Sequence, residues 1–166
     1  MFSGLLLCGT TEVTFDDKGR FAIPAKFRKD LKDNHDNQCV VTRSINFDEP
    51  CLWVYPLREW EKVQEQLAGL PNFGDSKKDR IYRILQRILI GSAQIGALDA
   101  QGRVLVSQEL RQSYQLNKKA FLIGCSNKFE LWSEETYLEQ QKRDEEALLE
   151  GLNASFDAQA LQNLRL

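Results

Sequence analysis

DDKGRFAIPAKFR, residues 16–28, combines a turn, an alternating apolar segment and a helix start. Aspartate and glycine are typical turn residues, because aspartate bonds its own backbone and glycine adopts positive φ freely. Residues 12–15 and 21–23 alternate as half-buried strands do. We therefore expect a β-hairpin with its tip at 16–19, followed by a short helix with Pro24 in its first turn. The side chains expected to face inward are Val13, Phe15, Phe21, Ile23, Phe27 and Leu31.

The same pattern occurs a second time. DAQGRVLVSQELR, residues 99–111, aligns with the first stretch at an offset of 83 and places Gly102 and Arg103 on Gly19 and Arg20. Internal repeats of this kind decide the architecture, so they are sought first. The alignment also pairs Phe21 with Val104, Ile23 with Val106, Phe27 with Leu110 and Arg28 with Arg111.

The likeness extends beyond these two stretches. Ser107 stands where the first copy has its proline, and serine is a common N-cap, so a different residue supplies the same helix start. Further along, CLWVYPLREW (51–60) resembles FELWSEETY (129–137) at an offset of 77. We predict two copies of one unit, at residues 10–59 and 93–136.

Two segments lie outside the copies. Residues 74–91 have the spacing of an amphipathic linker helix. Its apolar face comprises Ile81, Ile84, Leu85, Ile88 and Leu89, and its arginine stripe comprises Arg80, Arg83 and Arg87. The stripe suits either salt bridges within or between protomers, or contact with a DNA backbone. Residues 137–166 read as an acidic helix and tail, of which 152–166 has a weak pattern typical of a loosely held end.

The charge distribution is uneven. The 166 residues carry a net charge of −2, but residues 130–166 hold nine acids and three bases, and the other 129 hold fifteen acids and nineteen bases. An acidic end therefore masks a mildly basic body, which is compatible with a nucleic-acid partner. The start lacks the positive region of a signal peptide and no apolar run could cross a bilayer. With four cysteines and no CxxC pair, we expect reduced thiols and a cytoplasmic protein without a membrane partner.

Catalytic and metal-binding patterns are weak. His35 is the single histidine, and its polar neighbours predict a solvent-exposed loop without a catalytic role. Clustered ligands such as HExxH are absent from the sequence, as is a glycine-rich phosphate loop. Asp16 and Asp17 could bind a cation but are more typical of turn formation. We expect a protein that is not an enzyme and has no catalytic residue, metal site, cofactor or small-molecule substrate.

Binding residues are better represented. The expected tip offers Lys18, Gly19 and Arg20, and the helix after it offers Lys26 and Arg28. These cations could simply be solvated charges balancing nearby aspartates. However, Gly-Arg occurs twice after an Asp-containing turn, and a turn does not require the arginine. The guanidinium fork binds phosphate or guanine O6 and N7, and a two-stranded ribbon fits the major groove. We therefore predict double-stranded DNA contacts, with Arg103 as the equivalent in the second copy.

These residues closely resemble the MraZ family of bacterial transcriptional regulators, associated with the division and cell-wall gene cluster. The motifs are the doubled D-x-x-G-R, KGRFAIPAKFR, LWVYPLREWE, RILQRILIGSA and NKFELWSEE, in order from residue 1 to about 135. The resemblance implies an α+β fold in which two AbrB-like swapped-hairpin modules form an intramolecular pseudo-dimeric β-barrel core with peripheral helices. It also implies a ring-shaped homo-oligomer, associated with the nucleoid, that binds direct repeats in its own promoter and represses its operon.

The resemblance assigns DNA contact to the D-x-K-G-R motif, with Arg20 as the central residue and Lys18 beside it. The second copy departs from this motif, because Gln101 replaces the lysine. Arg103 thus suits either DNA contact or an interface between copies or protomers. Two other functions stay open: an antitoxin-like protein-binding module of the same fold, and a metal-dependent nuclease that uses Asp16 and Asp17.

Overall fold

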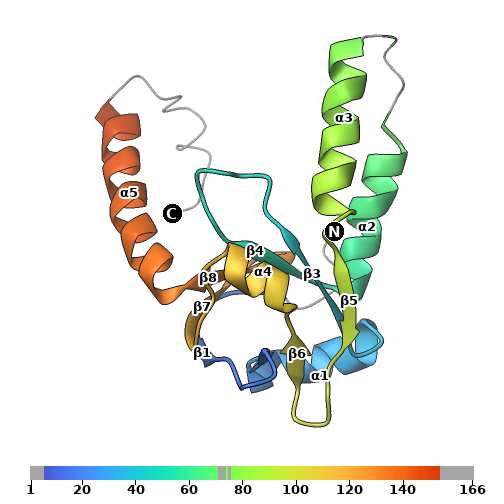
Figure 1. The fold of residues 1–166 in the computed structure, drawn as a ribbon, viewed down its shortest axis with the longest axis vertical. Coiled ribbons are helices and arrows are strands. Elements are labelled where there is room, and N and C mark those ends of the chain that lie inside the picture. Colours follow the sequence, from blue (N-terminus) through green and yellow to red (C-terminus); the bar gives the residue numbers. More distant parts are fainter. Residues whose placement is uncertain (1–5, 71–73, 75, 154–166) are drawn as a thin grey trace. The chain divides into compact units, whose positions relative to one another are not determined.

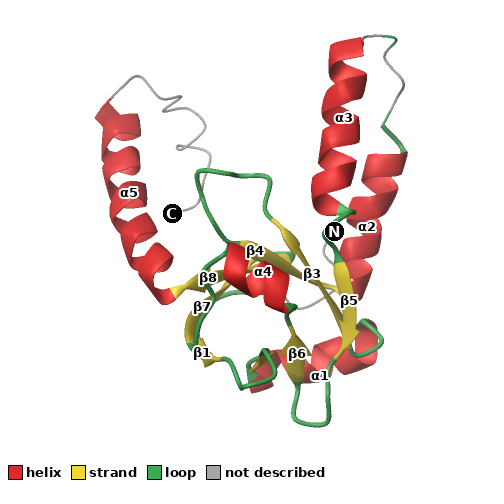
Figure 2. Cartoon of the chain, viewed as in Figure 1, coloured by secondary structure: helices red, strands yellow, loops and turns green. Residues whose placement is uncertain are grey.

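The chain folds as a mixed α+β protein whose strands are antiparallel (Figures 1 and 2). The computed structural model describes residues 6–70, 74 and 76–153. The chain divides into two compact units between Glu134 and Glu135. The elements are β1 (Thr10–Thr14), β2 (Arg20–Ala22), α1 (Ala25–Asn34), β3 (Gln38–Arg43), β4 (Leu52–Pro56), α2 (Leu57–Ala68), α3 (Ser76–Leu89), β5 (Gln94–Ala97), β6 (Arg103–Leu105), α4 (Gln108–Ser113), β7 (Lys119–Cys125), β8 (Lys128–Ser133) and α5 (Glu134–Asn153).

The order strand, strand, helix, strand, strand, helix occurs twice, with α3 between the two occurrences. One sheet has the order β1-β7-β8-β4-β3-β5, and β2 pairs with β6 in a second, two-stranded sheet. Exchanging equivalent strands of the two copies leaves both orders unchanged. The described strands therefore have an internal two-fold relationship, although they do not close into a barrel.

The expected hairpin is wrong in its pairing. The turn exists, because the Asp16 N–H donates to the Arg20 carbonyl and the Gly19 N–H donates to the Asp16 carbonyl, at 2.9 and 3.0 Å. The strands on either side of it then separate. β1 pairs with β7 and β2 pairs with β6, so each bonds to a strand of the other copy. The alternating pattern specifies which face of a strand is buried but not which strand is its neighbour.

The predicted core residues are confirmed. Val13, Phe15 and Leu31 are buried, and Phe21 and Ile23 have no exposed surface. Phe15 packs edge-on against Phe21 with ring centroids 5.5 Å apart. Burying an aromatic or branched apolar side chain stabilises the folded state by about 1.5–3 kcal/mol. The side chains of these strands and of α1 pack with their counterparts from the second copy in one hydrophobic core.

The two short helices begin where the sequence predicts. Pro24 is the residue before α1, one position earlier than the first-turn place expected. Ser107 caps α4, and its hydroxyl accepts a hydrogen bond from the Leu110 N–H at 3.3 Å. The tail expected at 152–166 lies almost wholly outside the described residues.

Helices α2 and α3 run side by side (Figure 1), and both Leu67 and Tyr82 line a hollow of about 270 Å³ between them. The apolar face of α3 is only partly covered: Leu89 is buried, whereas Ile81 is 56% exposed. All three arginines of the stripe are exposed, and none of them pairs with a carboxylate of a described residue. Among the described residues, therefore, the stripe forms none of the intrachain salt bridges that it was expected to suit.

His35 is not in a solvent-exposed loop, contrary to the expectation. It follows the last residue of α1, and only 7% of its surface is exposed. Its Nδ1 accepts a hydrogen bond from the Arg58 backbone N–H at 3.2 Å, which ties α1 to the start of α2. Burial lowers the pKa of His35 below 6.5. A helix end packed under a second helix has no local signature in the polar sequence around it.

Two further properties concern the chemistry available to the chain. All four cysteines are free. Burial raises the pKa of the Cys39 thiol to about 12, and it also raises the pKa of the Cys51 thiol. A helix both long enough and apolar enough to span a bilayer does not occur in the described part of the chain.

Candidate nucleic-acid interface

The β2–β6 ribbon places the two Gly-Arg motifs beside each other. Arg20 lies opposite Leu105, Phe21 opposite Val104, and Ala22 opposite Arg103. Phe21 and Val104 are buried, so the residues that flank them face outward. The outer face, which we call the ribbon face, consists of Arg20, Ala22, Arg103 and Leu105.

The turns before the two strands have the same construction. Asp16 Oδ1 accepts hydrogen bonds from the Lys18 and Arg20 N–H groups, at 3.0 and 2.9 Å. Asp99 Oδ1 accepts the equivalent pair from Gln101 and Arg103 at the same distances. In Figure 1 the second turn is the loop that joins β5 to β6. Each aspartate therefore fixes a turn and aligns the strand that follows it.

The two arginines and the two aspartates form one charge cluster. Arg20 Nε lies 2.8 Å from Asp16 Oδ2, and Arg103 Nε lies 2.7 Å from Asp99 Oδ2. Across the ribbon, Nη1 of each arginine lies 3.6 or 3.4 Å from the carboxylate of the other copy. The four side chains are 27–30% exposed.

The Arg20 guanidinium lies on the outer side of the ribbon but is not free in solvent. Two carboxylates hold it, although Nη2 of Arg20 and of Arg103 has no partner among the described residues. Hydrogen bonds from the Arg20 backbone and side chain lower the pKa of Asp16, and those from Arg103 lower the pKa of Asp99. Both aspartates are therefore ionised at neutral pH, and each arginine is held in a fixed orientation.

A second pair of arginines braces the turns across the two copies. Arg28 Nε donates to the Ile23 carbonyl at 2.7 Å, and its guanidinium lies against Gly102. Arg111 Nε donates to the Val106 carbonyl at 3.1 Å and lies against Gly19 in the same way. A Cβ at either glycine would collide with the guanidinium, and both glycines have positive φ, 83° at Gly19 and 73° at Gly102. Glycine is thus required at both positions for two reasons, the lack of space for a Cβ and the positive φ.

The structure brings some of the predicted site residues together and separates others. Arg20 and Arg103 lie on the ribbon face, and Lys18 is exposed at the adjoining turn. Gly19 is buried beneath Arg111. Lys26 is exposed on α1, where its Nζ lies 3.4 Å from the Cys8 carbonyl and 4.8 Å from the Phe27 ring centroid. Arg28 reaches the interface but is turned towards Gly102.

Sequence reasoning missed the part that four residues play in this interface. Arg111 aligns with Arg28, but nothing in the alignment indicates a contact with the opposite turn. Asp99 and Asp16 were recognised as turn formers, not as carboxylates that hold the arginines of both copies. The exposed Leu105 is unremarkable until β6 is known to pair with β2.

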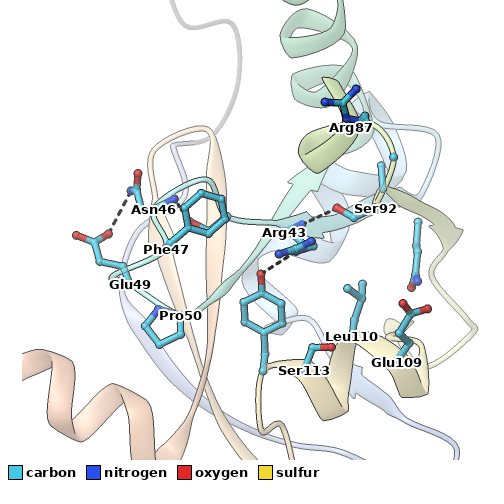
Figure 3. Close-up of a pocket in the computed structure, with 15 residues that line it drawn as sticks. Arg43, Asn46, Phe47, Glu49, Pro50, Arg87, Ser92, Glu109, Leu110 and Ser113 are labelled. Atoms are coloured by element: carbon cyan, nitrogen blue, oxygen red, sulfur yellow. Dashed lines mark hydrogen bonds between the residues drawn. The ribbon is translucent and has the colours of Figure 1, made fainter. Parts of the chain in front are cut away.

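A polar hollow lies elsewhere, and no residue of the ribbon face lines it (Figure 3). It measures about 570 Å³ and lies between the β3–β4 loop, the segment after α3, and α4. Arg43 crosses it and donates to the Tyr114 hydroxyl at 3.3 Å and, through its backbone N–H, to Ser92 Oγ at 3.1 Å (Figure 3). Glu49 and Glu109 offset Arg43 and Arg87 there, so the hollow has no strong preference for either sign of charge.

A metal-dependent reaction has no support in this geometry. The Asp16 carboxylate already accepts four N–H groups, two from the backbone, one from the Arg20 side chain and one from the Arg103 side chain. Within residues 6–70, 74 and 76–153, no group of three or more histidine, cysteine or acidic side chains is placed to hold a metal ion.

Comparison with known proteins identifies the family. The family model described as "MraZ protein, putative antitoxin-like" matches residues 6–81 and 89–158. Curated relatives named "Transcriptional regulator MraZ", and not named as enzymes, include one from Actinobacillus pleuropneumoniae serotype 3 (strain JL03), 39% identical, and one from Haemophilus influenzae (strain PittEE), 40% identical. Each alignment covers 95% of this chain and 98% of the relative. A third, from Pseudoalteromonas translucida (strain TAC 125), is 39% identical over 83% of this chain and 86% of its own length. The chain therefore belongs to the MraZ family.

Proposed function

We propose that this protein is a sequence-specific, double-stranded DNA-binding regulator of transcription, and that the ribbon face enters the major groove. The observation that carries the proposal is the convergence of Arg20 and Arg103 on one outer face, each with Nη2 unpaired by any described residue. A two-stranded ribbon fits the major groove, and a guanidinium recognises guanine O6 and N7 or phosphate. The relatives' name, transcriptional regulator, agrees with this role.

The aspartates favour this function although they neutralise charge. Because Asp16 and Asp99 hold Nε of each arginine, the guanidinium planes are oriented before DNA arrives. A pre-oriented side chain loses less conformational entropy on binding. The Lys18 side chain, exposed at the first turn, adds a phosphate contact. Arg103 occupies the place equivalent to Arg20, so we propose that it shares the contact, while Arg28 serves the turn and Lys26 approaches the flanking backbone.

The finer parts of the proposal concern assembly and target. The two copies, at 10–59 and 93–136, act as an intramolecular pseudo-dimer with one shared core, and the linker helix at 74–91 and the acidic segment 137–166 belong to neither copy. One ribbon makes few phosphate contacts and binds weakly on its own. A ring-shaped homo-oligomer presents several ribbons, and linked sites gain about 10²–10⁴ in avidity. Such a ring suits direct repeats in the promoter of a division and cell-wall operon, which the protein represses in the cytoplasm at the nucleoid.

The deciding experiment measures binding to a duplex from the protein's own upstream region, by gel shift and fluorescence anisotropy. We expect Arg20→Ala to abolish specific binding and Arg103→Ala to weaken it strongly, with the larger loss at Arg20 because Lys18 stands on its side. Arg143→Ala, which removes an exposed arginine from α5, is the matched control and should bind normally. Sedimentation should show unchanged assembly for all three. Full promoter binding by Arg20→Ala would refute the proposal.

A second candidate is an antitoxin-like module that binds another protein. The family description includes the words antitoxin-like, and the apolar face of α3 is only partly covered. Co-purification of a second protein in fixed ratio, together with equal affinity for all DNA sequences, would favour this function over the first.

A further inference from the structure

The ribbon face is not symmetric, although the backbone that carries it is. The offset of 83 makes Leu105 the counterpart of Ala22, and Gln101 the counterpart of Lys18. Leu105 is 58% exposed, which leaves a large apolar side chain in solvent between charged neighbours. Ala22 presents only a methyl group at the equivalent place. The two arginines therefore have equivalent aspartate partners, whereas the residues next to them on the ribbon face and in the turns differ.

Leu105 is placed to act together with Arg20. The two residues lie directly opposite each other in the β2–β6 ladder, where Cβ atoms are about 4.5–5.5 Å apart. Any surface that Arg20 reaches is therefore also within reach of Leu105. Packing within the chain does not explain the leucine, because the inward positions of the ribbon are filled by Phe21 and Val104.

We infer that Leu105 is a specificity-determining residue that contacts the C5-methyl group of a thymine next to the base pair bound by Arg20. This inference rests on the proposed DNA-binding function. In the major groove, thymine alone among the four bases presents a methyl group, and apolar side chains recognise it. The neighbouring cations favour DNA over an apolar protein surface as the occupant, since Lys18 is exposed and no described residue pairs with Nη2 of either arginine.

The consequence is a binding site with a direction. A ribbon with identical halves reads a sequence and its reverse complement equally well. With Leu105 on one side and Ala22 on the other, only one orientation on the duplex places the leucine at the thymine. The ribbon thus distinguishes the two directions of an otherwise symmetric contact.

The experiment replaces each thymine of the upstream duplex in turn by deoxyuridine, which lacks only the methyl group, and measures the Kd of wild type and Leu105→Ala. We expect one replacement to weaken wild-type binding about fourfold, the effect of exposing one methyl-sized group. Leu105→Ala should bind the unmodified duplex about as weakly and be insensitive to that replacement. Leu148→Ala, a leucine of similar exposure on α5, should behave as wild type.

A swap variant tests the direction. In Ala22→Leu combined with Leu105→Ala, the sensitive thymine should move to the other side of the arginine contacts. The inference would be overturned if no thymine replacement changed the Kd of wild type, or if Leu105→Ala were as sensitive to the replacement as wild type. In either case, loss of specific binding in Arg20→Ala would still support the proposed function. Loss of assembly in Leu105→Ala, measured by light scattering, would instead assign the leucine to an interface between copies and also overturn it. Failure of wild type to bind any duplex would overturn both proposals.

Discussion

The guanidinium of Arg28 lies against Gly102, so helix α1 of the first copy supports the turn of the second. Backbone hydrogen bonds reinforce this contact in both directions: the Ile23 N–H donates to the Gly102 carbonyl, and the Val106 N–H donates to the Gly19 carbonyl, each at 2.9 Å. The turns that carry the arginines are therefore positioned by the opposite copy.

Gly102→Ala is expected to lower the free energy of unfolding by about 1–3 kcal/mol, because alanine is strained at a φ of 73° and its Cβ meets the Arg28 guanidinium. Urea unfolding followed by circular dichroism measures the change. Gly96→Ala is the control. Its added Cβ has no neighbour within 4 Å and its φ is not positive, so we expect a gain of about 0.5–1 kcal/mol. An unchanged free energy of unfolding in Gly102→Ala would contradict the contact between Gly102 and the Arg28 guanidinium.

Arg28 and Lys18 are expected to differ in how their removal affects DNA binding. Arg28→Ala should lower the free energy of unfolding by about 1–3 kcal/mol, since it removes a charged hydrogen-bond donor from the Ile23 carbonyl. It should leave the slope of log K against log salt concentration unchanged. Lys18→Ala should reduce that slope by about one without affecting stability, because it removes a phosphate contact.

Titration of the Kd between low and moderate salt provides the comparison. A reduced slope in Arg28→Ala with unchanged stability would mean that Arg28 contacts phosphate directly, as its sequence position first suggested.

Acid should destabilise the protein through Asp16 and Asp99. Their pKa values in the folded state lie below the ordinary aspartate value of 3.8 because the bound backbone and arginine N–H groups favour the ionised form. This stabilisation is fully present above that value and is lost as pH falls through the lower folded pKa. Asp16→Asn combined with Asp99→Asn should therefore be less stable at pH 7 and show a shallower loss between pH 4 and 2.

Thermal unfolding across this pH range makes the test, with Asp17→Asn as the control, since Asp17 is an exposed carboxylate of the same turn. A double variant with the same acid profile as wild type would show that the cluster does not contribute.

His35 should produce a separate pH dependence at milder acidity. Burial holds its pKa below 6.5 in the folded state, so the unfolded chain binds the proton more readily. Stability should fall as pH decreases below about 6.5. His35→Gln, which retains an acceptor for the Arg58 N–H, should lose less stability between pH 7 and 5.5. Melting temperatures of wild type and His35→Gln, measured over this pH range, test the prediction. If the two melting temperatures changed with pH in parallel, His35 would be excluded as the cause.

The sequence predicted which side chains are buried better than which strands are neighbours. Phe21 and Ile23 follow from alternation alone, because a strand with one buried face has a period of two. The pairing of β1 with β7 depends on residues more than 100 positions apart and has no local signal. The predicted turn at 16–19 is confirmed, yet the strands on either side of it pair with strands of the other copy.

The candidate site was predicted in its residue types but not in its contacts. The doubled Gly-Arg identified Arg20 and Arg103, since a turn alone does not need an arginine. That two carboxylates hold Arg20 could not be deduced, because Asp99 is distant in the chain and reaches it only through the β2–β6 pairing. His35 was misplaced because the residues that bury it lie on α2, beyond its polar neighbours.

The exchange of strands between the copies resembles what two separate, identical subunits would do, yet here one peptide contains both. In an assembly of identical subunits every amino-acid change appears in both halves, and the halves stay equal. Covalent fusion removes that constraint. A mutation at codon 105 leaves codon 22 untouched, so each half can evolve its own preference while the shared core keeps the pair together.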